Sequence, residues 1–223
     1  YKRIAESLRA FRRVVRLVPE AKMILVGEPH PAFPVHDLIR ALGLSPNVRV
    51  IGFAPIDDFV GYISACDVVL NLRYPTVGES SGSMLRAMGL GKAVLASDVG
   101  AFREFSDEIC LKVPVGAGEE DYIFEYLNTL VSRPEMAHAM GRRAREWVER
   151  ECAWEKVAAR YVRFLECVAV GGEWIEEAPI EEAVAPAARE ESVAAPVPEP
   201  EPPAGPSVET PVPATEDYIL GWV

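Results

Sequence analysis

The residues best suited to chemistry lie in one short segment, residues 78–83, which reads Gly-Glu-Ser-Ser-Gly-Ser. Its small side chains let another molecule approach the backbone closely, and the pattern that follows predicts a helix over residues 80–90. The first N–H groups of a helix are free to bind an anion, and phosphate is the obvious candidate. A second interpretation stays open, in which Ser80 caps the helix and Gly82 relieves crowding.

Charged residues near this segment also have two interpretations. Glu79 could hold sugar hydroxyls beside a bound phosphate, or it could be a surface carboxylate that the helix N-terminus stabilises. Arg73 and Arg86 could meet phosphate or carboxylate groups of a ligand, or they could form ordinary salt bridges. Neither choice follows from the spacing alone.

Other kinds of catalytic arrangement are not visible in the sequence. There is no Ser-His-Asp set, no paired carboxylates for acid and base catalysis, and no set of metal ligands. The four cysteines form no CxxC pair and have no ligand-like spacing to the three histidines. This usage indicates reduced, mostly buried thiols in a cytosolic protein.

The elements that must position these residues alternate along the chain. Short apolar runs predict buried strands at residues 23–26, 48–52, 67–72, 93–97 and, more weakly, 109–113. Helical spacing predicts helices at residues 2–18, 35–42, 56–64, 80–90, 119–131, 134–151 and 154–169. Such alternation is typical of a doubly wound α/β domain with a parallel sheet, whose ligands bind outside the carboxyl ends of the strands. The apolar stripe of the last helix predicts that it packs against another surface.

Charge and composition divide the 223 residues into three parts. Residues 1–172 are neutral overall and are predicted to form the folded domain, whereas residues 173–223 hold 12 acidic residues and one basic residue. Proline, alanine and glutamate dominate residues 173–215, which predicts a disordered acidic linker. Residues 216–223 end in the apolar sequence Tyr-Ile-Leu-Gly-Trp-Val. They are either a docking motif for a protein partner or an end without a role.

The same composition excludes two classes of protein. No run of 18 apolar residues is available to cross a membrane, so we expect no transmembrane segment. No basic footprint indicates binding to nucleic acid. Because the first residue is Tyr1 and Lys2 already stands at a predicted helix start, we expect the chain to be part of a longer polypeptide.

Several motifs occur together in an order that a known family shows. They are Lys2-Arg3 at a helix start, Ile24-Leu25-Val26-Gly27-Glu28, Val48-Arg49-Val50-Ile51-Gly52-Phe53, the segment at residues 78–83, Arg86-Ala87-Met88-Gly89-Leu90-Gly91-Lys92-Ala93-Val94, and Ser97-Asp98-Val99-Gly100. With this ordered set, residues 2–166 resemble the C-terminal, donor-binding half of a family 4 retaining glycosyltransferase of the GT-B fold. The resemblance implies a Rossmann-like domain that binds a nucleotide diphosphate sugar.

The resemblance also implies positions for the nucleotide. Lys2 would meet the diphosphate, Gly27 and Glu28 would line the nucleotide cleft, and the backbone near Phe53 would face the base. Glu79 looks like the first glutamate of the family's two-glutamate motif and would hold the donor sugar as the catalytic-site carboxylate. The residues around the diphosphate would be Gly78, Ser80, Ser81, Gly82 and Ser83.

One position departs from the family pattern. Most members have a second glutamate just before the Ala-Met pair, and it contacts the ribose, but this chain has Arg86 there. Eight positions before Arg86 stands Gly78 rather than Glu79, so the spacing is one residue short. Arginine cannot accept hydrogen bonds from ribose hydroxyls, although it could meet a phosphate, so we include Arg86 among the nucleotide-sugar-binding residues.

The function that the resemblance implies is transfer of a hexose from a nucleotide diphosphate sugar to a glycan or lipid acceptor, without a metal or other cofactor. We expect a cytoplasmic location, with a peripheral position at the inner face of the membrane left open. The N-terminal acceptor-binding domain, expected before Lys2, is missing, so the chain alone should bind donor weakly and transfer nothing.

Two alternatives remain. The first is a catalytically inactive, glycosyltransferase-like module that lost its activity at Arg86 and displays the acidic tail to a partner. The second is a nucleotide-sugar epimerase, which is disfavoured because no pair of side chains suited to proton abstraction and return is visible.

Overall fold

The computed structural model describes residues 1–175 and 219–222, which belong to two units. The first unit consists of residues 1–158 together with residues 216–223, and the second consists of residues 159–215. All six strands of the sheet belong to the first unit. The candidate site, at the carboxyl ends of these strands, lies in the first unit as well.

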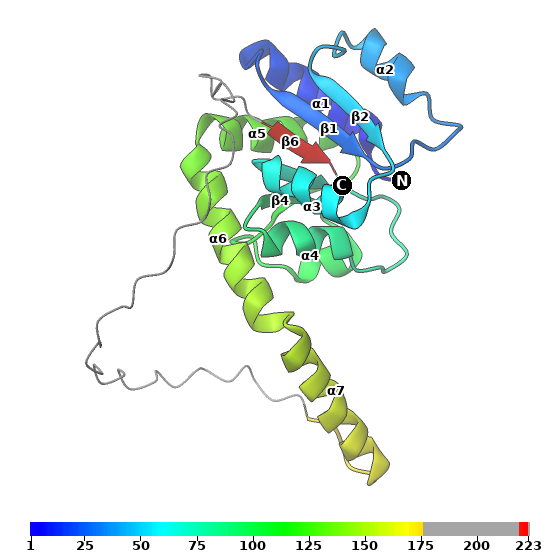
Figure 1. Ribbon diagram of the computed structural model, residues 1–223, viewed down its shortest axis with the longest axis vertical. Coiled ribbons are helices and arrows are strands. Elements are labelled where there is room, and N and C mark those ends of the chain that lie inside the picture. Colours follow the sequence, from blue (N-terminus) through cyan, green and yellow to red (C-terminus); the bar gives the residue numbers. More distant parts are fainter. Residues whose placement is uncertain (176–218, 223) are drawn as a thin grey trace, which may run out of the picture. The chain divides into compact units, whose positions relative to one another are not determined.

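The first unit is built on a six-stranded sheet in which each pairing between neighbouring strands is parallel. In sheet order the strands are β2 (Val48–Gly52), β1 (Lys22–Val26), β6 (Ile219–Trp222), β3 (Val68–Asn71), β4 (Ala93–Ser97) and β5 (Leu111–Val113) (Figure 1). Five of these strands lie where the short apolar runs predict them. The doubly wound parallel sheet expected from the sequence is therefore confirmed.

Helices cover both faces of this sheet, as the continuous apolar strands require. They are α1 (Ile4–Leu17), α2 (Val35–Ala41), α3 (Ile56–Ala65), α4 (Gly82–Gly89), α5 (Glu119–Ser132) and α6 (Pro134–Glu151), with a short 3₁₀ helix at Gly100–Glu104. Neighbouring residues of β3 show the two layers. Val68 and Leu70 belong to the core that includes α1, α2 and α5, whereas Val69 belongs to the core that includes α3 and α4.

A close backbone approach fixes α6 against the turn that follows α4. A Cβ atom built on Gly141, in the middle of α6, would lie 1.8 Å from the carbonyl oxygen of Gly91. Any larger residue at position 141 would clash with this oxygen, so only glycine fits. Gly141 therefore lets α6 approach the turn between α4 and β4. The helix contributes its own buried Ala144 to the core that includes α3 and α4.

The strand β6 is a feature that the sequence interpretation missed. It pairs with β1 on one edge and with β3 on the other, and Figure 1 shows it in red beside β1. Neither sequence-based interpretation, a docking motif for another protein or an end without a role, placed residues 219–222 in the sheet. Most of the predicted acidic linker, residues 176–215, lies outside the described residues.

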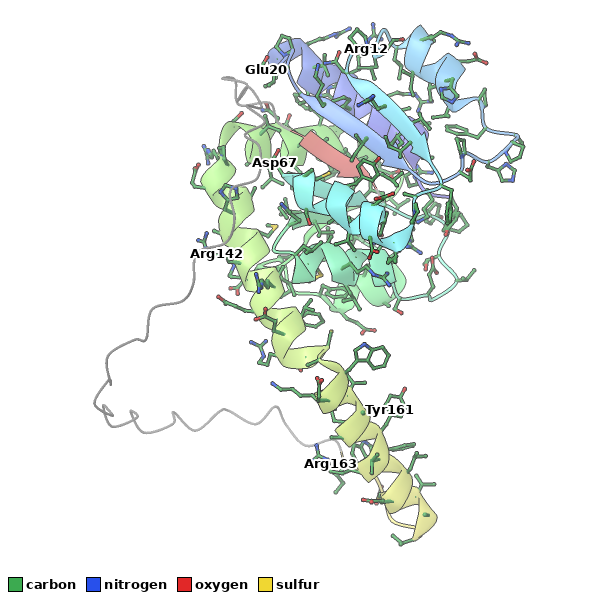
Figure 2. The ribbon with its side chains drawn as sticks, in the orientation of Figure 1. Arg12, Glu20, Asp67, Arg142, Tyr161 and Arg163 are labelled. Carbon is green, nitrogen blue, oxygen red and sulfur yellow. The ribbon has the colours of Figure 1, made fainter. Side chains whose placement is uncertain are left out.

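The helix α7 (Trp154–Ala169) lies where it was predicted, but the exposure of its apolar stripe differs from the prediction. Its apolar stripe was expected to pack against another surface, but Tyr161, Leu165 and Val168 are exposed, and α7 has no buried residue. Figure 2 shows Tyr161 and Arg163 extending from this helix. One ring contact covers part of the stripe, because Phe164 meets Trp174 edge-on with 5.6 Å between the ring centroids.

Within residues 1–175 and 219–222, no helix has both the length and the apolar character that crossing a bilayer requires.

Candidate functional site

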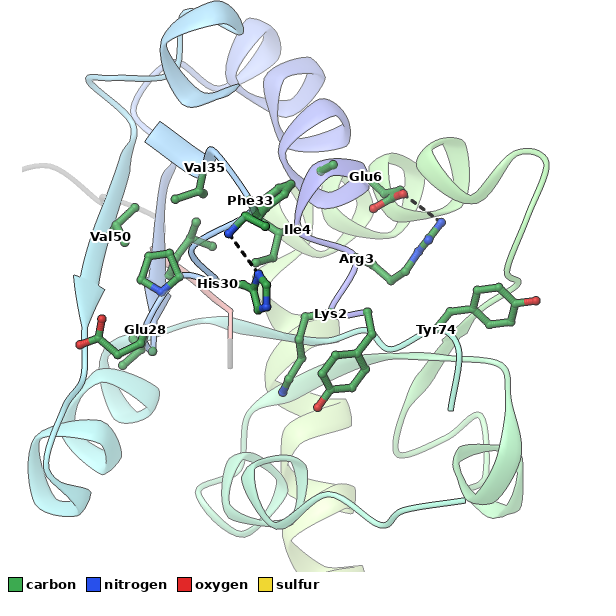
Figure 3. A pocket seen from close by; sticks show the side chains of 17 residues that line it. Lys2, Arg3, Ile4, Glu6, Glu28, His30, Phe33, Val35, Val50 and Tyr74 are labelled. Carbon is green, nitrogen blue, oxygen red and sulfur yellow. Dashed lines mark hydrogen bonds and ion pairs between the residues drawn. The ribbon is translucent and has the colours of Figure 1, made fainter. Parts of the chain in front are cut away.

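The candidate site is a cavity of about 780 Å³ at the carboxyl end of β1. Three parts of the chain contribute lining residues, which Figure 3 shows: Lys2 at the start of the chain, Glu28 just after β1, and Tyr74 in the loop after β3. From β1 the chain continues to β2 at one edge of the sheet, whereas from β3 it continues to β4 and β5 toward the other edge. The direction in which strands are added to the sheet therefore reverses between β1 and β3. This is the place where open parallel sheets bind ligands.

Contacts on both sides of Lys2 fix it at this cavity. The Tyr74 N–H donates to the carbonyl oxygen of Tyr1 (2.7 Å), which ties the start of the chain to the loop after β3. Arg3 has a left-handed backbone (φ 55°), and its Nε donates to Oε1 of Glu119 (2.9 Å) while its Nη2 pairs with the other carboxylate oxygen. Glu119 is buried, so the pair leaves Arg3 with little freedom. Lys2 is held between these two anchored residues.

The charge of Lys2 is sensitive to its surroundings. The pKa of its ammonium group is lowered to about 8, by burial first and then by the positive charge of Arg73, whereas the negative charge of Glu79 acts in the opposite direction. Both charged residues are therefore close enough to act on Lys2. A bound anion would favour the charged ammonium, because it offsets the cost of desolvating that charge.

Glu28 links the ends of β1 and β2. Its Oε1 accepts a hydrogen bond from the Phe53 N–H (3.1 Å), and the Gly27 N–H donates to the carbonyl oxygen of Gly52 (2.7 Å). Gly27 has φ 128°, a conformation that favours glycine, so the chain can turn here into the cavity lining. The Phe53 ring is exposed, and its backbone N–H is already occupied by the carboxylate.

Glu79 is held by donors from its own loop. Its Oε2 accepts from the Thr76 hydroxyl (2.8 Å) and from the Val77 N–H (2.9 Å), and its Oε1 lies 3.5 Å from Nη1 of Arg73. These hydrogen bonds, the Val77 N–H first, lower the pKa of the carboxyl group to about 2. Glu79 is therefore ionised at neutral pH and can only accept hydrogen bonds. Oε1 keeps capacity for a further donor, such as a sugar hydroxyl.

Arg73 connects Glu79 with the start of α4. The residue is only 8% exposed, and its Nη2 donates to Oγ of Ser81 (2.8 Å) while its backbone N–H donates to Oγ of Ser97 (2.8 Å). Its Nε is buried without a hydrogen-bond partner in the described part of the chain. Of the two interpretations open for Arg73, the structure contains the salt bridge. That salt bridge lies in the site itself, so Arg73 positions Glu79.

The start of α4 differs from its prediction by two residues. The helix begins at Gly82, and its cap is Ser81, whose Oγ accepts from the Met84 N–H (3.3 Å). The interpretation of Ser80 as the cap is therefore wrong, and Ser80 is exposed. Because the Ser81 hydroxyl also donates to Oδ1 of Asn71 (2.9 Å), it is used within the protein.

The first turn of α4 is partly exposed, and the guanidinium group of Arg86 lies next to it. Gly82 is exposed and Ser83 is half-buried, and Gly78, in the loop before them, is exposed with φ 86°. Nη1 of Arg86 lies 3.3 Å from the point where a Cβ atom on Gly82 would stand. The guanidinium group therefore lies over the helix start, where it adds to the positive end of the helix dipole.

The structure thus divides the predicted site residues into two groups. Lys2, Gly27 and Glu28 line the cavity, whereas residues 78–83 and Arg86 surround the start of α4 and do not line it. Phe53 belongs to neither group: it does not line the cavity, and its N–H donates to Glu28, which does. Lys2 connects the groups through its electrostatic interactions with Arg73 and Glu79. Together they offer cations and backbone amides to an anion, and a carboxylate to hydroxyl groups.

Sequence reasoning missed the residues that hold Lys2 in place. Arg3 and Glu119 are 116 positions apart, and Tyr1 and Tyr74 meet through the backbone, so no local pattern could reveal either contact. Arg73 was recognised as a candidate but not included among the site residues. Among residues 1–175 and 219–222, no three His, Cys, Asp or Glu side chains gather as metal ligands. The expectation that no metal takes part stays a prediction.

Known proteins resemble this chain in sequence and in fold. Residues 1–147 match the family described as Glycosyl transferases group 1. The N-acetyl-alpha-D-glucosaminyl L-malate synthase of Bacillus anthracis is 26% identical over 161 residues, which are 72% of this chain and 41% of that protein. The chain therefore spans about two fifths of the length of this curated relative.

Two solved structures show the same fold. The Anabaena HepE structure, in complex with UDP-glucose, is 20% identical and has a TM-score of 0.65 over 74% of this chain and 45% of that one. The C-terminal domain of the group 1 glycosyl transferase LpcC from Francisella tularensis is 21% identical, with a TM-score of 0.60 over 67% of this chain and 79% of that one. The fold is that of the C-terminal half of a GT-B enzyme. The chain belongs to the family of group 1 glycosyl transferases.

Proposed function

We propose that this chain is the donor-binding half of a retaining glycosyltransferase that moves a hexose from a nucleotide diphosphate sugar to a glycan or lipid acceptor. The observation that carries the proposal is the meeting of Lys2, Arg73 and Glu79 where β1 and β3 end. The ammonium group of Lys2 suits a diphosphate, and the ionised carboxylate of Glu79, which Arg73 holds in place, suits the hydroxyls of the attached sugar. The HepE structure, with its bound UDP-glucose, supports this choice of ligand.

Each residue then has a role in the reaction. Lys2 and the first N–H groups of α4 stabilise the negative charge that develops on the departing diphosphate, as preorganised donors do. Glu79 accepts hydrogen bonds from the sugar and orients it, because a carboxyl group with a pKa of about 2 carries no proton to donate. Arg73 keeps Glu79 and the α4 cap in register and is a positioning residue.

In this proposal Arg86 contacts a phosphate, whereas the glutamate that most family members have at this position contacts the ribose. Its guanidinium group lies over the start of α4, next to Gly82, and offers only donors. A phosphate is the part of a sugar nucleotide that such a group can bind. The ribose is then left to other groups, with Glu28 at the rim of the cavity as the carboxylate available.

Calorimetric titrations with UDP and with UDP-glucose test the proposal. We expect Lys2→Ala to weaken the binding of both ligands at least tenfold, because it removes a cation from the diphosphate. We expect Glu79→Ala to weaken UDP-glucose binding and to leave UDP binding nearly unchanged, because this carboxylate contacts only the sugar.

A matched control uses Lys22, which lies at the opposite, amino end of β1. Lys22→Ala removes the same charge from the chain but should leave both affinities unchanged. If the chain binds UDP-glucose tightly and neither Lys2→Ala nor Glu79→Ala weakens this binding more than the control Lys22→Ala does, the assignment is contradicted.

Arg86→Glu separates the enzyme from the inactive module. If Arg86 binds a phosphate, this variant binds UDP more weakly than the natural chain. If donor binding is absent from the natural chain and appears only in Arg86→Glu, the inactive interaction module is the correct description.

A further inference from the structure

A turn after β1 holds one imidazole ring in a fixed orientation. The carbonyl oxygen of His30 accepts a hydrogen bond from the Phe33 N–H (2.8 Å), and its Nδ1 accepts another from the Ala32 N–H (3.2 Å). Pro29 and Pro31 stand on either side of His30. Proline fixes its own φ and restricts the backbone of the residue before it. The backbone and the ring of His30 therefore have little freedom.

The hydrogen bond to Nδ1 determines where the neutral imidazole carries its proton. Because the Ala32 N–H is the donor, Nδ1 of His30 must offer its lone pair and cannot carry a proton. In the neutral ring the proton is then on Nε2. Among the residues that the structure describes, none forms a hydrogen bond with Nε2. His30 therefore offers one N–H donor to a ligand.

The imidazole of His30 lies in the lining of the candidate cavity, which also contains Lys2 and Glu28. In the view of Figure 3 the ring stands between these two side chains. His30 is exposed, so a bound ligand can reach it. Because Nδ1 faces the chain's own backbone, Nε2 lies on the outer edge of the ring. The donor is therefore accessible from the cavity.

The neighbours of His30 in the lining indicate which part of a nucleotide it meets. The ammonium group of Lys2 offers only donors, whereas an ionised carboxylate such as that of Glu28 offers only acceptors. Ribose hydroxyls, which donate, suit the carboxylate. The oxygens of an ionised phosphate accept, so a phosphate can take hydrogen bonds from Lys2 and from His30 at the same time.

We propose that His30 is a further nucleotide-binding residue and that its Nε2–H donates to a phosphate group of the sugar nucleotide. This inference rests on the proposed function, because it takes the cavity as the place of the nucleotide. The turn orders the ring before the ligand arrives, which lowers the entropy cost of binding. His30 thus adds a neutral, directional donor to the positive charge of Lys2.

Two substitutions separate this role from a purely structural one. In His30→Asn the side-chain oxygen can take the place of Nδ1 and accept from the Ala32 N–H, as asparagine does in turns, but no group reaches the place of Nε2. In His30→Gln the amide nitrogen can reach the place of Nε2 and donate, whereas the turn loses its acceptor. A phosphate contact predicts that His30→Asn is the more harmful change for ligand binding, and a structural role predicts the reverse.

Calorimetric titration of the full chain with UDP measures the difference. We expect His30→Asn to weaken UDP binding at least fivefold and His30→Gln to weaken it less than twofold. His36→Asn is the matched control, because His36 is exposed on α2 and does not line the cavity, and it should leave the affinity unchanged. Equal affinities of the two His30 variants, or weaker binding by His30→Gln, overturn the proposal.

Nitrogen NMR of the natural chain, with ¹⁵N in its three histidines, locates the contact. At about pH 8 an ordinary imidazole is neutral, and His30 should show the Nε2–H tautomer. UDP should shift the Nε2 signal of His30 and leave His36 and His138 unchanged, whereas uridine, which has no phosphate, should shift none of them. An equal shift with uridine overturns the phosphate contact, and an Nδ1–H tautomer overturns the role of the turn.

The same titrations distinguish a failure of this inference from a failure of the proposed function. If the natural chain binds UDP and Lys2→Ala weakens the binding but His30→Asn does not, His30 is not a ligand and the proposed function stands. If the natural chain binds neither UDP nor UDP-glucose, the proposed function fails and this inference fails with it.

Discussion

Arg73 fixes the positions of Glu79 and Ser81, two polar residues of the site. It is nearly buried, and it contacts Glu79 and Ser81 through its side chain and Ser97 through its backbone. Ser81 in turn caps α4, so one guanidinium group relates the carboxylate that would hold the sugar to the helix that would bind the phosphate. A short chain of buried hydrogen bonds thus links the end of β3 to both parts.

Removing this guanidinium group should destabilise the domain. Arg73→Met removes one hydrogen-bond donor from Ser81 and one from Glu79, and losing one partner of a buried hydrogen bond costs about 1–3 kcal/mol. Urea denaturation measures this difference in the free energy of unfolding. Arg103→Met is the matched control, because Arg103 is largely exposed and pairs with Asp98 at the surface, and it should change stability by less than about 0.5 kcal/mol. Equal effects of the two changes would contradict the role of Arg73.

The lowered pKa of Lys2 predicts how ligand binding depends on pH. Below about pH 8 the ammonium group is charged, and above it the free protein loses this charge. UDP binding should therefore weaken as pH rises through 8, and near pH 8 binding should take up a proton. Calorimetry in two buffers of different ionisation enthalpy measures that proton. Lys2→Arg, whose charge persists, should remove the dependence, and an affinity that is flat from pH 7 to 9.5 in the natural chain would exclude Lys2 as a ligand.

The local sequence pattern predicted those helices and strands whose formation does not depend on a distant part of the chain. Five strands and seven helices were found from apolar runs and helical spacing, because a strand buried on both faces must be apolar throughout. The same rules could not place β6, since its position depends on two strands at the other end of the sequence. They also failed for the stripe of α7, because apolar spacing shows which face could be buried and not whether anything covers it.

The candidate site divides in the same way. Glu79 and the small residues before α4 form one short segment, so their types and spacing could be recognised together. The contacts that hold Lys2, from Arg3 to Glu119 and from Tyr1 to Tyr74, join distant parts of the chain and left no signal. Arg73 had a visible charge but an ambiguous role until the structure gave its partners.

The packing of α6 makes a test at the level of one element. Gly141→Ala places a methyl group 1.8 Å from the Gly91 carbonyl oxygen and must push the helix away, which should cost at least about 1–3 kcal/mol. Gly61→Ala is the matched control, because Gly61 lies in α3 with nothing within 4 Å of the added carbon. It should stabilise the protein by about 0.5–1 kcal/mol. Thermal unfolding of both variants measures the difference, and a neutral Gly141→Ala would mean that α6 does not sit against this turn.

At the scale of the whole molecule, the chain carries one half of the apparatus that its family uses. It spans 41% of the curated relative, and the matched region holds the fold of the C-terminal half of a GT-B enzyme. The residues that line the cavity at β1 come from this half. Binding and transfer should therefore be separable in this chain.

We expect the isolated chain to bind UDP-glucose weakly and to transfer no glucose. Release of UDP, followed by a coupled assay with added glycan or lipid acceptors, should stay at the background rate, while calorimetry detects binding. Adding a separately produced acceptor-binding half should raise the rate. Turnover by the chain alone would show that this half suffices.

The place of β6 has a consequence for how the gene could be rearranged. The end of β6 pairs with Leu25, and Leu25 and Tyr1 line the same cavity. Joining the two ends by a short peptide and opening the chain within residues 176–218 would give a circular permutant in which β6, α1 and β1 follow one another directly. Such a permutant has a lower contact order, so it should fold faster than the natural connection while keeping the same sheet.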